Sequence, residues 1–76
     1  MRTLEATAEV EEVIFRVKPR CQACGDVLVE GTTATEFDFH GKRPREYACL
    51  GCAVEYHQAV TPLGATSRDV TVRYKR

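Results

Sequence analysis

Residues 47–56 read YACLGCAVEY, in which two cysteines spaced Cys-x-x-Cys stand directly before a run of residues with helical spacing. A second pair with the same spacing lies upstream in RCQACGD, residues 20–26. There the second cysteine precedes Gly25, which permits a positive φ and therefore a tight turn. The first pair thus belongs to a turn, whereas the second pair opens a helix.

Two close pairs of cysteines indicate a metal site. Each Cys-x-x-Cys can hold two thiolates on one side of an ion, and two pairs complete the tetrahedral shell that structural zinc prefers. We therefore predict one structural Zn²⁺ bound by Cys21, Cys24, Cys49 and Cys52. The same four sulfurs could instead bind iron, act as redox thiols or pair as disulfides. His57, on the expected helix, is a less favoured substitute ligand.

The length and the termini narrow the class of protein. A chain of 76 residues buries a small core, so a metal or disulfides would add needed stability. The N-terminal stretch lacks the features of a secretory signal, which predicts a cytoplasmic protein with reduced cysteines. No apolar run is long enough to span a bilayer, so no membrane partner is expected.

Alternation of apolar and polar residues predicts the other elements. Val13, Phe15 and Val17 share one face of a strand over residues 12–18, and Val70, Val72 and Tyr74 do so near the C-terminus. These two strands are expected to pair. Residues 32–48 predict a β-hairpin with its loop at 40–44, in which Phe37 and Phe39 face the core. The helix after Cys49 is expected to bury a stripe formed by Leu50, Ala53, Val54 and Ala59, with Tyr56 and Val60 as further candidates.

The order of knuckle, hairpin and helix is similar to that of treble-clef zinc fingers. A zinc ribbon, the alternative, would repeat the glycine-bearing knuckle at its second pair. CQACG, YACLGC and Tyr56 locally resemble the GATA-type finger over residues 21–57, although TATEFDF replaces that family's hairpin arginines. A looser similarity links the chain to the zinc fingers of poly(ADP-ribose) polymerase type, whose third ligand is His where this chain has Cys49.

We therefore predict an α+β fold, a small zinc-stabilised treble-clef-like domain with added N- and C-terminal strands. Its boundaries are an acidic leader over residues 1–9, which could be flexible, and a single zinc-binding domain over residues 10–76. Residues 1–12 hold one basic and four acidic groups, a net of −3, so the remainder carries +3.

The expected function is that of a non-catalytic binding module. Four thiolates leave an ion no open position for substrate, and no motif places an acid or nucleophile beside either histidine. A protein partner is favoured, with homodimerisation through open strand edges as a further possibility. The alternative is nucleic-acid binding through the hairpin loop and the C-terminal tail. The candidate contacts are Lys42, Arg43, Arg45, Arg73, Lys75 and Arg76.

Overall fold

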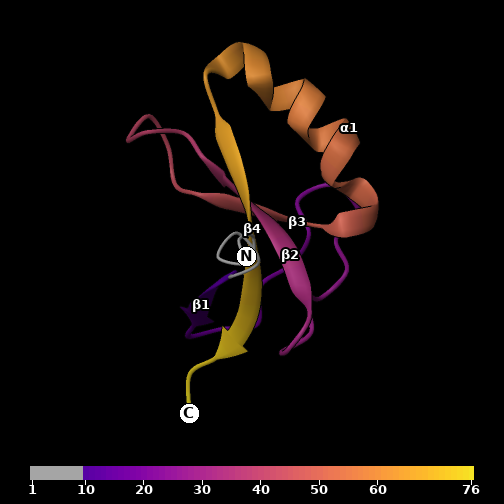
Figure 1. Ribbon diagram of the computed structural model, residues 1–76, viewed down its shortest axis with the longest axis vertical. Helices are drawn as coiled ribbons and strands as arrows, with labels where there is room; N and C mark the ends of the chain where they lie inside the picture. Colours follow the sequence, from indigo (N-terminus) through magenta and orange to yellow (C-terminus); the bar gives the residue numbers. More distant parts are fainter. Residues whose placement is uncertain (1–9) are drawn as a thin grey trace, which may run out of the picture.

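The computed structural model describes residues 10–76, so the predicted leader over residues 1–9 lies outside the described residues. The chain forms an α+β domain with a single four-stranded mixed sheet and one α-helix (Figure 1). Its elements, in chain order, are β1 Glu11–Phe15, β2 Thr33–Asp38, β3 Glu46–Cys49, α1 Leu50–Val60, the short 3₁₀ helix η2 Thr61–Leu63 and β4 Thr66–Tyr74.

Strand β4 runs through the middle of the sheet, whose strand order is β1-β4-β2-β3 (Figure 1). It pairs in parallel with β1 and antiparallel with β2, so that Val70 stands opposite both Glu11 and Ala34. The predicted pairing of the N-terminal and C-terminal strands is therefore confirmed. They do not form a separate sheet, however, because β4 also joins the β2–β3 hairpin and leaves β1 at the edge.

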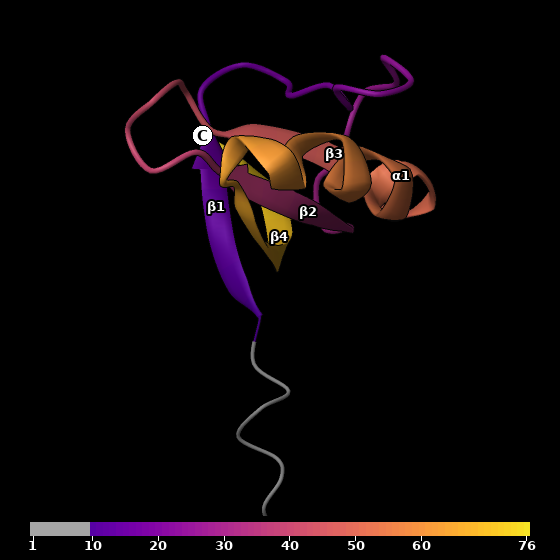
Figure 2. The ribbon, with the colours of Figure 1, turned by 90° about the horizontal axis from the view of Figure 1, so that it is seen from above.

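Both faces of the sheet are covered near its centre. On one face, the Phe37 ring packs edge-on against the Tyr56 ring of α1, with centroids 5.0 Å apart. On the other face, the long segment between β1 and β2 supplies buried Leu28, whose carbonyl accepts a hydrogen bond from the Tyr74 hydroxyl at 2.7 Å. Figure 2 shows this segment passing alongside β3. Phe37 and Phe39 are buried, as predicted.

Helix α1 begins where predicted but packs through a different stripe. Val60 is buried and Tyr56 half-buried, whereas Leu50, Val54 and Ala59 are exposed. The prediction for those three side chains was wrong because the helix is anchored at Cys49 and Cys52, which turns the side bearing Tyr56 and Val60 toward the sheet. Within residues 10–76, no helix has the length and apolarity needed to cross a membrane.

Strand β1 is shorter than expected and ends at Phe15. Val13 and Phe15 are half-buried, but Val17 is 78% exposed, so its predicted place in the core was wrong. The last ladder bond runs from the Lys75 N–H to the Phe15 carbonyl, after which the chain bends toward Pro19. Proline cannot donate to a ladder, and it leads the chain into the first cysteine pair.

A buried carboxylate lies in the centre of β2. Glu36 is only 3% exposed. It accepts hydrogen bonds from the Tyr47 hydroxyl and from Nε of Arg68, both at 2.8 Å. Burial and the neighbouring Glu36 carboxylate raise the pKa of Tyr47 to about 12, so this hydroxyl keeps its proton at neutral pH. Arg68 also pairs with Glu11 and thereby connects β1 to the same network.

The rotated packing of α1 predicts opposite results for the same substitution at two positions of one helix. Val60→Ala should lower the free energy of unfolding by about 2 kcal/mol, because it removes two buried methyl groups and leaves a cavity. Val54→Ala, at a site that is 70% exposed, should change it by less than about 0.5 kcal/mol. Urea denaturation of zinc-loaded protein measures both, and equal losses would contradict the packing.

The Glu36 network should show energetic coupling. Tyr47→Phe should lower the free energy of unfolding by about 1–2 kcal/mol, since it removes a donor from a buried carboxylate. In a Glu36→Gln background the same change should cost less, because a neutral amide depends less on that donor. A double-mutant cycle by urea denaturation measures the difference, and additive effects would argue against the network.

Candidate metal centre

The first cysteine pair lies in a knuckle whose main chain points at a sulfur atom. The backbone N–H groups of Ala23 and Cys24 both donate to Sγ of Cys21 at 3.4 Å. The turn closes through a bond from the Gly25 N–H to the Cys21 carbonyl at 2.9 Å, with Gly25 at φ 82°. The predicted turn is confirmed, and it shows why glycine follows the pair: an L side chain at this φ would be strained.

The second pair spans the junction between β3 and α1. Cys49 ends β3 and is the N-cap of α1, while Cys52 lies in the first helical turn. Within residues 50–60, that first turn carries no acidic side chain and no side chain caps it. The second ligand pair therefore lies beside the free N–H groups and the positive end of the helix dipole.

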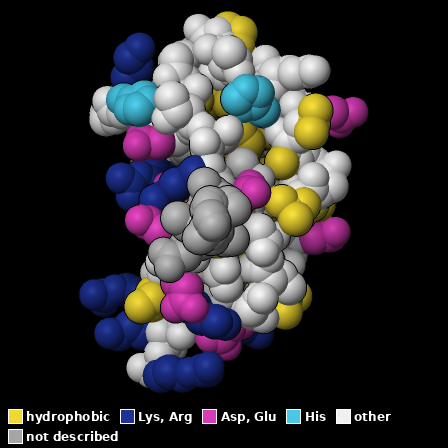
Figure 3. All heavy atoms as spheres, in the orientation of Figure 1, with side chains coloured by type: hydrophobic (Ala, Val, Ile, Leu, Met, Phe, Trp, Pro, Cys, Tyr) yellow, Lys and Arg dark blue, Asp and Glu magenta, His cyan; other side chains and the backbone are white. Residues whose placement is uncertain are grey.

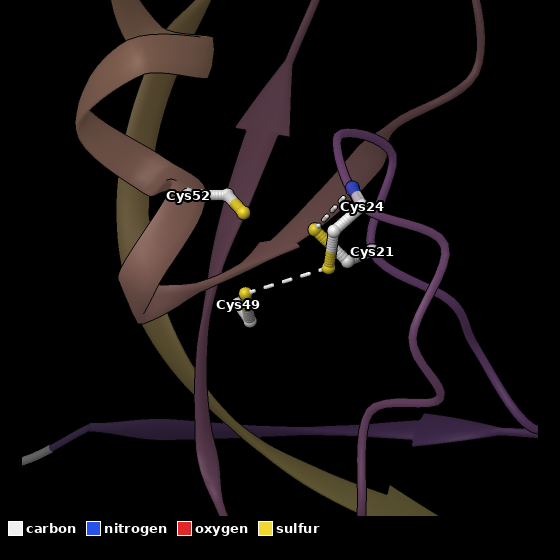
Figure 4. Close-up of side chains that lie close together, drawn as sticks. All are labelled: Cys21, Cys24, Cys49 and Cys52. Carbon is white, nitrogen blue, oxygen red and sulfur yellow. Dashed lines mark hydrogen bonds between the residues drawn. The ribbon is translucent and has the colours of Figure 1, made fainter.

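The four sulfur atoms converge on one point (Figure 4). All four lie within 4.8 Å of one another, and those of Cys24 and Cys49 are 4.0 Å apart. Zinc–sulfur bonds of about 2.3 Å place tetrahedral ligands about 3.8 Å apart, so the arrangement fits one such ion. The Cys24–Cys49 separation is about twice a disulfide bond length, and all four cysteines are free thiols.

The thiols differ in their affinity for protons, which bears on metal binding. Burial raises the pKa of Cys21, but N–H groups of Cys24, Cys49 and Ala23 outweigh this effect and lower it to about 6. Hydrogen bonds with the Cys49 and Cys24 thiols raise the pKa of Cys52 to about 12. Four anions so close together repel one another, so the cluster carries four negative charges only when a cation replaces the protons.

Other residues singled out near the site have different partners. His57 lies outside the cysteine cluster, where Nδ1 is 3.3 Å from the Ser67 hydroxyl. Tyr47 and Tyr56 flank the second cysteine pair in the sequence. Their hydroxyls donate to carboxylates, of Glu36 and Glu46 respectively. The sequence pattern gave no sign of the acceptors because each pairing joins two different elements.

Most of the candidate phosphate contacts lie against acidic groups. Ion pairs join Arg43 to Glu46 at 3.3 Å, Arg45 to Asp38 at 3.9 Å, Arg73 to Glu12 at 3.0 Å and Arg76 to Glu30 at 3.2 Å. The Arg43 guanidinium also stacks over the Phe39 ring at 4.2 Å. Lys42 and Lys75 are exposed and form no ion pair within residues 10–76.

Comparisons with models of protein families, with curated proteins and with solved structures found no match to this chain.

Loss of a single ligand should unfold most of the domain. Structural metal contributes about 10–16 kcal/mol in small fingers, which is comparable with the whole stability of a domain. Cys24→Ser and Cys49→Ser should therefore bind no zinc at micromolar concentration and lose the cooperative thermal transition. Native mass spectrometry and circular dichroism measure these effects, with and without chelator.

Ala23→Ser is the matched control, because it introduces a hydroxyl into the same knuckle at an exposed position that is not a ligand. This variant should keep one metal ion per chain and melt like wild type. A Cys49→Ser protein with an unchanged melt would show that the cluster is not a structural metal site.

Proposed function

We propose that this chain is a small, non-catalytic binding module, stabilised by one zinc ion, that contacts another protein. One contrast on its surface carries the proposal. Four of the six candidate phosphate contacts pair with carboxylates, whereas several large apolar side chains are exposed. Neutralised cations weaken the attraction for phosphate, and exposed apolar groups are what protein interfaces bury.

Some of the exposed apolar side chains lie close to one another on the surface. Leu50 and Val54 are one turn apart on α1 and are both more than half exposed. Figure 3 shows hydrophobic side chains on the surface where α1 lies in Figure 1. Ile14 on β1 is 65% exposed and lies on a strand at the sheet edge. Clustered apolar surface and an open edge both support protein contacts.

The metal is proposed to be zinc and its role structural. Four sulfur ligands fill a tetrahedral shell, so the ion would offer substrate no position. Zinc also suits a site whose role is to hold the knuckle against the helix, because the ion has no redox chemistry of its own. We place the protein in the cytoplasm, where a reducing environment keeps thiols available to the ion.

The core is proposed to be of treble-clef type. Support comes from the order of knuckle, β2–β3 hairpin and α1, with the second ligand pair at the helix start. A GATA-like reading of DNA is not part of the proposal. In the first hairpin strand, where that family has arginines, this chain places Glu36 and Phe37, and both are buried.

Two assays on the zinc-loaded protein separate a protein partner from the nucleic-acid alternative. The proposal predicts that the zinc-loaded protein captures another protein stoichiometrically from a lysate of the cells in which it naturally occurs. This complex should survive nuclease treatment and salt of about 300 mM. The proposal also predicts weak mobility shifts with DNA and RNA that vanish at the same salt. Metal analysis of the same sample should give one zinc per chain.

The alternative predicts the reverse pattern. Tight nucleic-acid binding that falls steeply with salt, and falls again in Lys42→Ala/Arg43→Ala/Arg45→Ala, would refute a protein partner as the main ligand. Leu50→Ser/Val54→Ser is the matched surface variant. It should leave any phosphate binding unchanged, since both residues are uncharged and lie on the helix.

A further inference from the structure

The parallel pairing of β1 with β4 brings two separate basic segments together. Because they are parallel, both strands finish at the same end of the sheet, where the Lys75 N–H donates to the Phe15 carbonyl at 2.8 Å. The residues after Phe15 therefore adjoin the tail of the chain. Figure 3 shows Lys and Arg side chains gathered at the end of the molecule where β4 finishes. We call this region the basic end; it comprises Arg16 and Lys18, in the segment that follows β1, and Arg73, Lys75 and Arg76, at the end of β4 and in the tail.

The basic end keeps an excess of positive charge. Glu12 pairs with Arg73, and Glu30 pairs with Arg76. In the described part of the chain, Arg16, Lys18 and Lys75 have no carboxylate within ion-pair distance, and all three are exposed. Five side-chain cations against two side-chain carboxylates leave a side-chain net of +3 at this end. The hairpin loop, in contrast, has two of its three cations paired.

Next to the basic end, β1 presents an open edge. It is the outer strand of the sheet, and its only strand partner within residues 10–76 is β4. The Phe15 carbonyl points to β4, and main-chain groups alternate in direction along a strand. The N–H and C=O groups of Glu12 and Ile14 consequently face away from β4. Such groups are a template for an added strand.

A shallow hollow adjoins this edge. It has a volume of about 380 Å³. Its lining consists of Ile14 and Tyr74, the cations Arg73, Lys75 and Arg76, and the carboxylates Glu12 and Glu30. Helix α1 packs mainly on β2 and β3, and the side chain of Ile14 on β1 is 65% exposed. The hollow thus offers apolar Ile14 beside two ion pairs, and Lys75 is the cation of its lining that has no carboxylate within ion-pair distance in residues 10–76.

We propose that an extended, acidic segment of a partner protein adds as a strand to the free edge of β1. An apolar side chain of that segment occupies the hollow against Ile14, and its carboxylates lie beside Arg16, Lys18 and Lys75. The inference rests on the proposed function, since it names the class of protein segment that the module binds. It requires both main-chain pairing and negative charge.

A protein segment fits these features better than nucleic acid does. All six aromatic side chains are at least half-buried, so none is available as a platform for a base. The outward N–H and C=O groups of Glu12 and Ile14 alternate as donors and acceptors. Another strand matches this alternation, whereas a sugar–phosphate chain offers mainly acceptors. The pairing of apolar Ile14 with flanking cations matches a peptide that mixes apolar and acidic residues.

The test uses a fluorescein-labelled peptide of about ten residues, in which Val and Thr alternate and the last four residues are Asp or Glu. Fluorescence anisotropy with zinc-loaded full-length protein, in salt of about 150 mM, should show saturable binding. Arg16→Glu/Lys18→Glu should weaken it by at least about tenfold. Lys42→Glu/Arg45→Glu, with the same change in net charge at the hairpin loop, should stay within about twofold of wild type.

Main-chain pairing is tested separately with two N-methylated versions of the peptide. Methylation of alternate residues in one register removes the N–H groups that face β1, and the other register removes those that face solvent. One version should lose binding by at least about tenfold and the other should keep it. Amide hydrogen exchange of Ile14 should slow in the complex, as measured by NMR.

Several results would overturn the inference. They are an acidic peptide that does not bind, equal losses in the two charge-reversal variants, or equal binding of both N-methylated peptides. A thymidine oligonucleotide of matched charge that binds more tightly and is lost in Arg16→Glu/Lys18→Glu would make the basic end a phosphate site and refute the proposed function too. Protein capture lost only in Leu50→Ser/Val54→Ser would refute this site and leave the proposed function standing.

Discussion

Four sulfur atoms must meet around one ion, and the arrangement of the knuckle, the β2–β3 hairpin and the start of α1 follows from that requirement. Cys21 and Cys24 sit in a turn that main-chain N–H groups and Gly25 hold open, whereas Cys49 and Cys52 straddle the point where a strand becomes a helix. For the two pairs to meet, the hairpin between them must fold back so that β3 ends beside the knuckle. The bond from the Gln22 N–H to the Tyr47 carbonyl, at 2.9 Å, joins the knuckle to β3. Local turn chemistry, strand pairing and metal coordination therefore favour the same structure, as expected for a chain too small to rely on its core alone.

The metal does not by itself account for the rest of the sheet. Strand β4 connects the metal-bearing hairpin to β1, and its side chains Val70 and Val72 are fully buried. The Glu36 carboxylate, with its donors Tyr47 and Arg68, adds a polar contact between β2, β3 and β4. A buried charge is tolerated there because both donors are in place, and losing either would leave it poorly solvated. The network thereby favours one register of the three strands over a shifted one.

Local patterns predicted the elements, and contacts distant in sequence decided what the patterns left open. The knuckle, the hairpin loop, the start of the helix and the four ligands follow from cysteine spacing, glycine and periodicity. The buried side of α1 does not, since Leu50 and Val54 satisfy helical spacing as well as Tyr56 and Val60 do; the anchoring of Cys49 and Cys52 selects between them. The burial of Glu36 could not be predicted because its donors come from β3 and β4. The joining of Arg16 and Lys18 to the tail depends on parallel pairing, which alternation cannot distinguish from antiparallel pairing.

The central position of β4 has a kinetic consequence. In the sheet, β4 lies between β1 and β2, but in the chain it is the last element. Neither neighbour can therefore complete its pairing until residues 66–74 have joined the sheet. Metal binding can close the loop between the cysteine pairs early, because those contacts span less of the sequence than the β1–β4 ladder does. The ladder that joins the two ends of the described chain is the costliest contact to form in chain entropy, which favours slow folding for a domain of this size. Until β4 docks, β1 has no strand partner and β2 is paired only with β3. The partly folded molecule is most prone to mispairing with other chains at that stage.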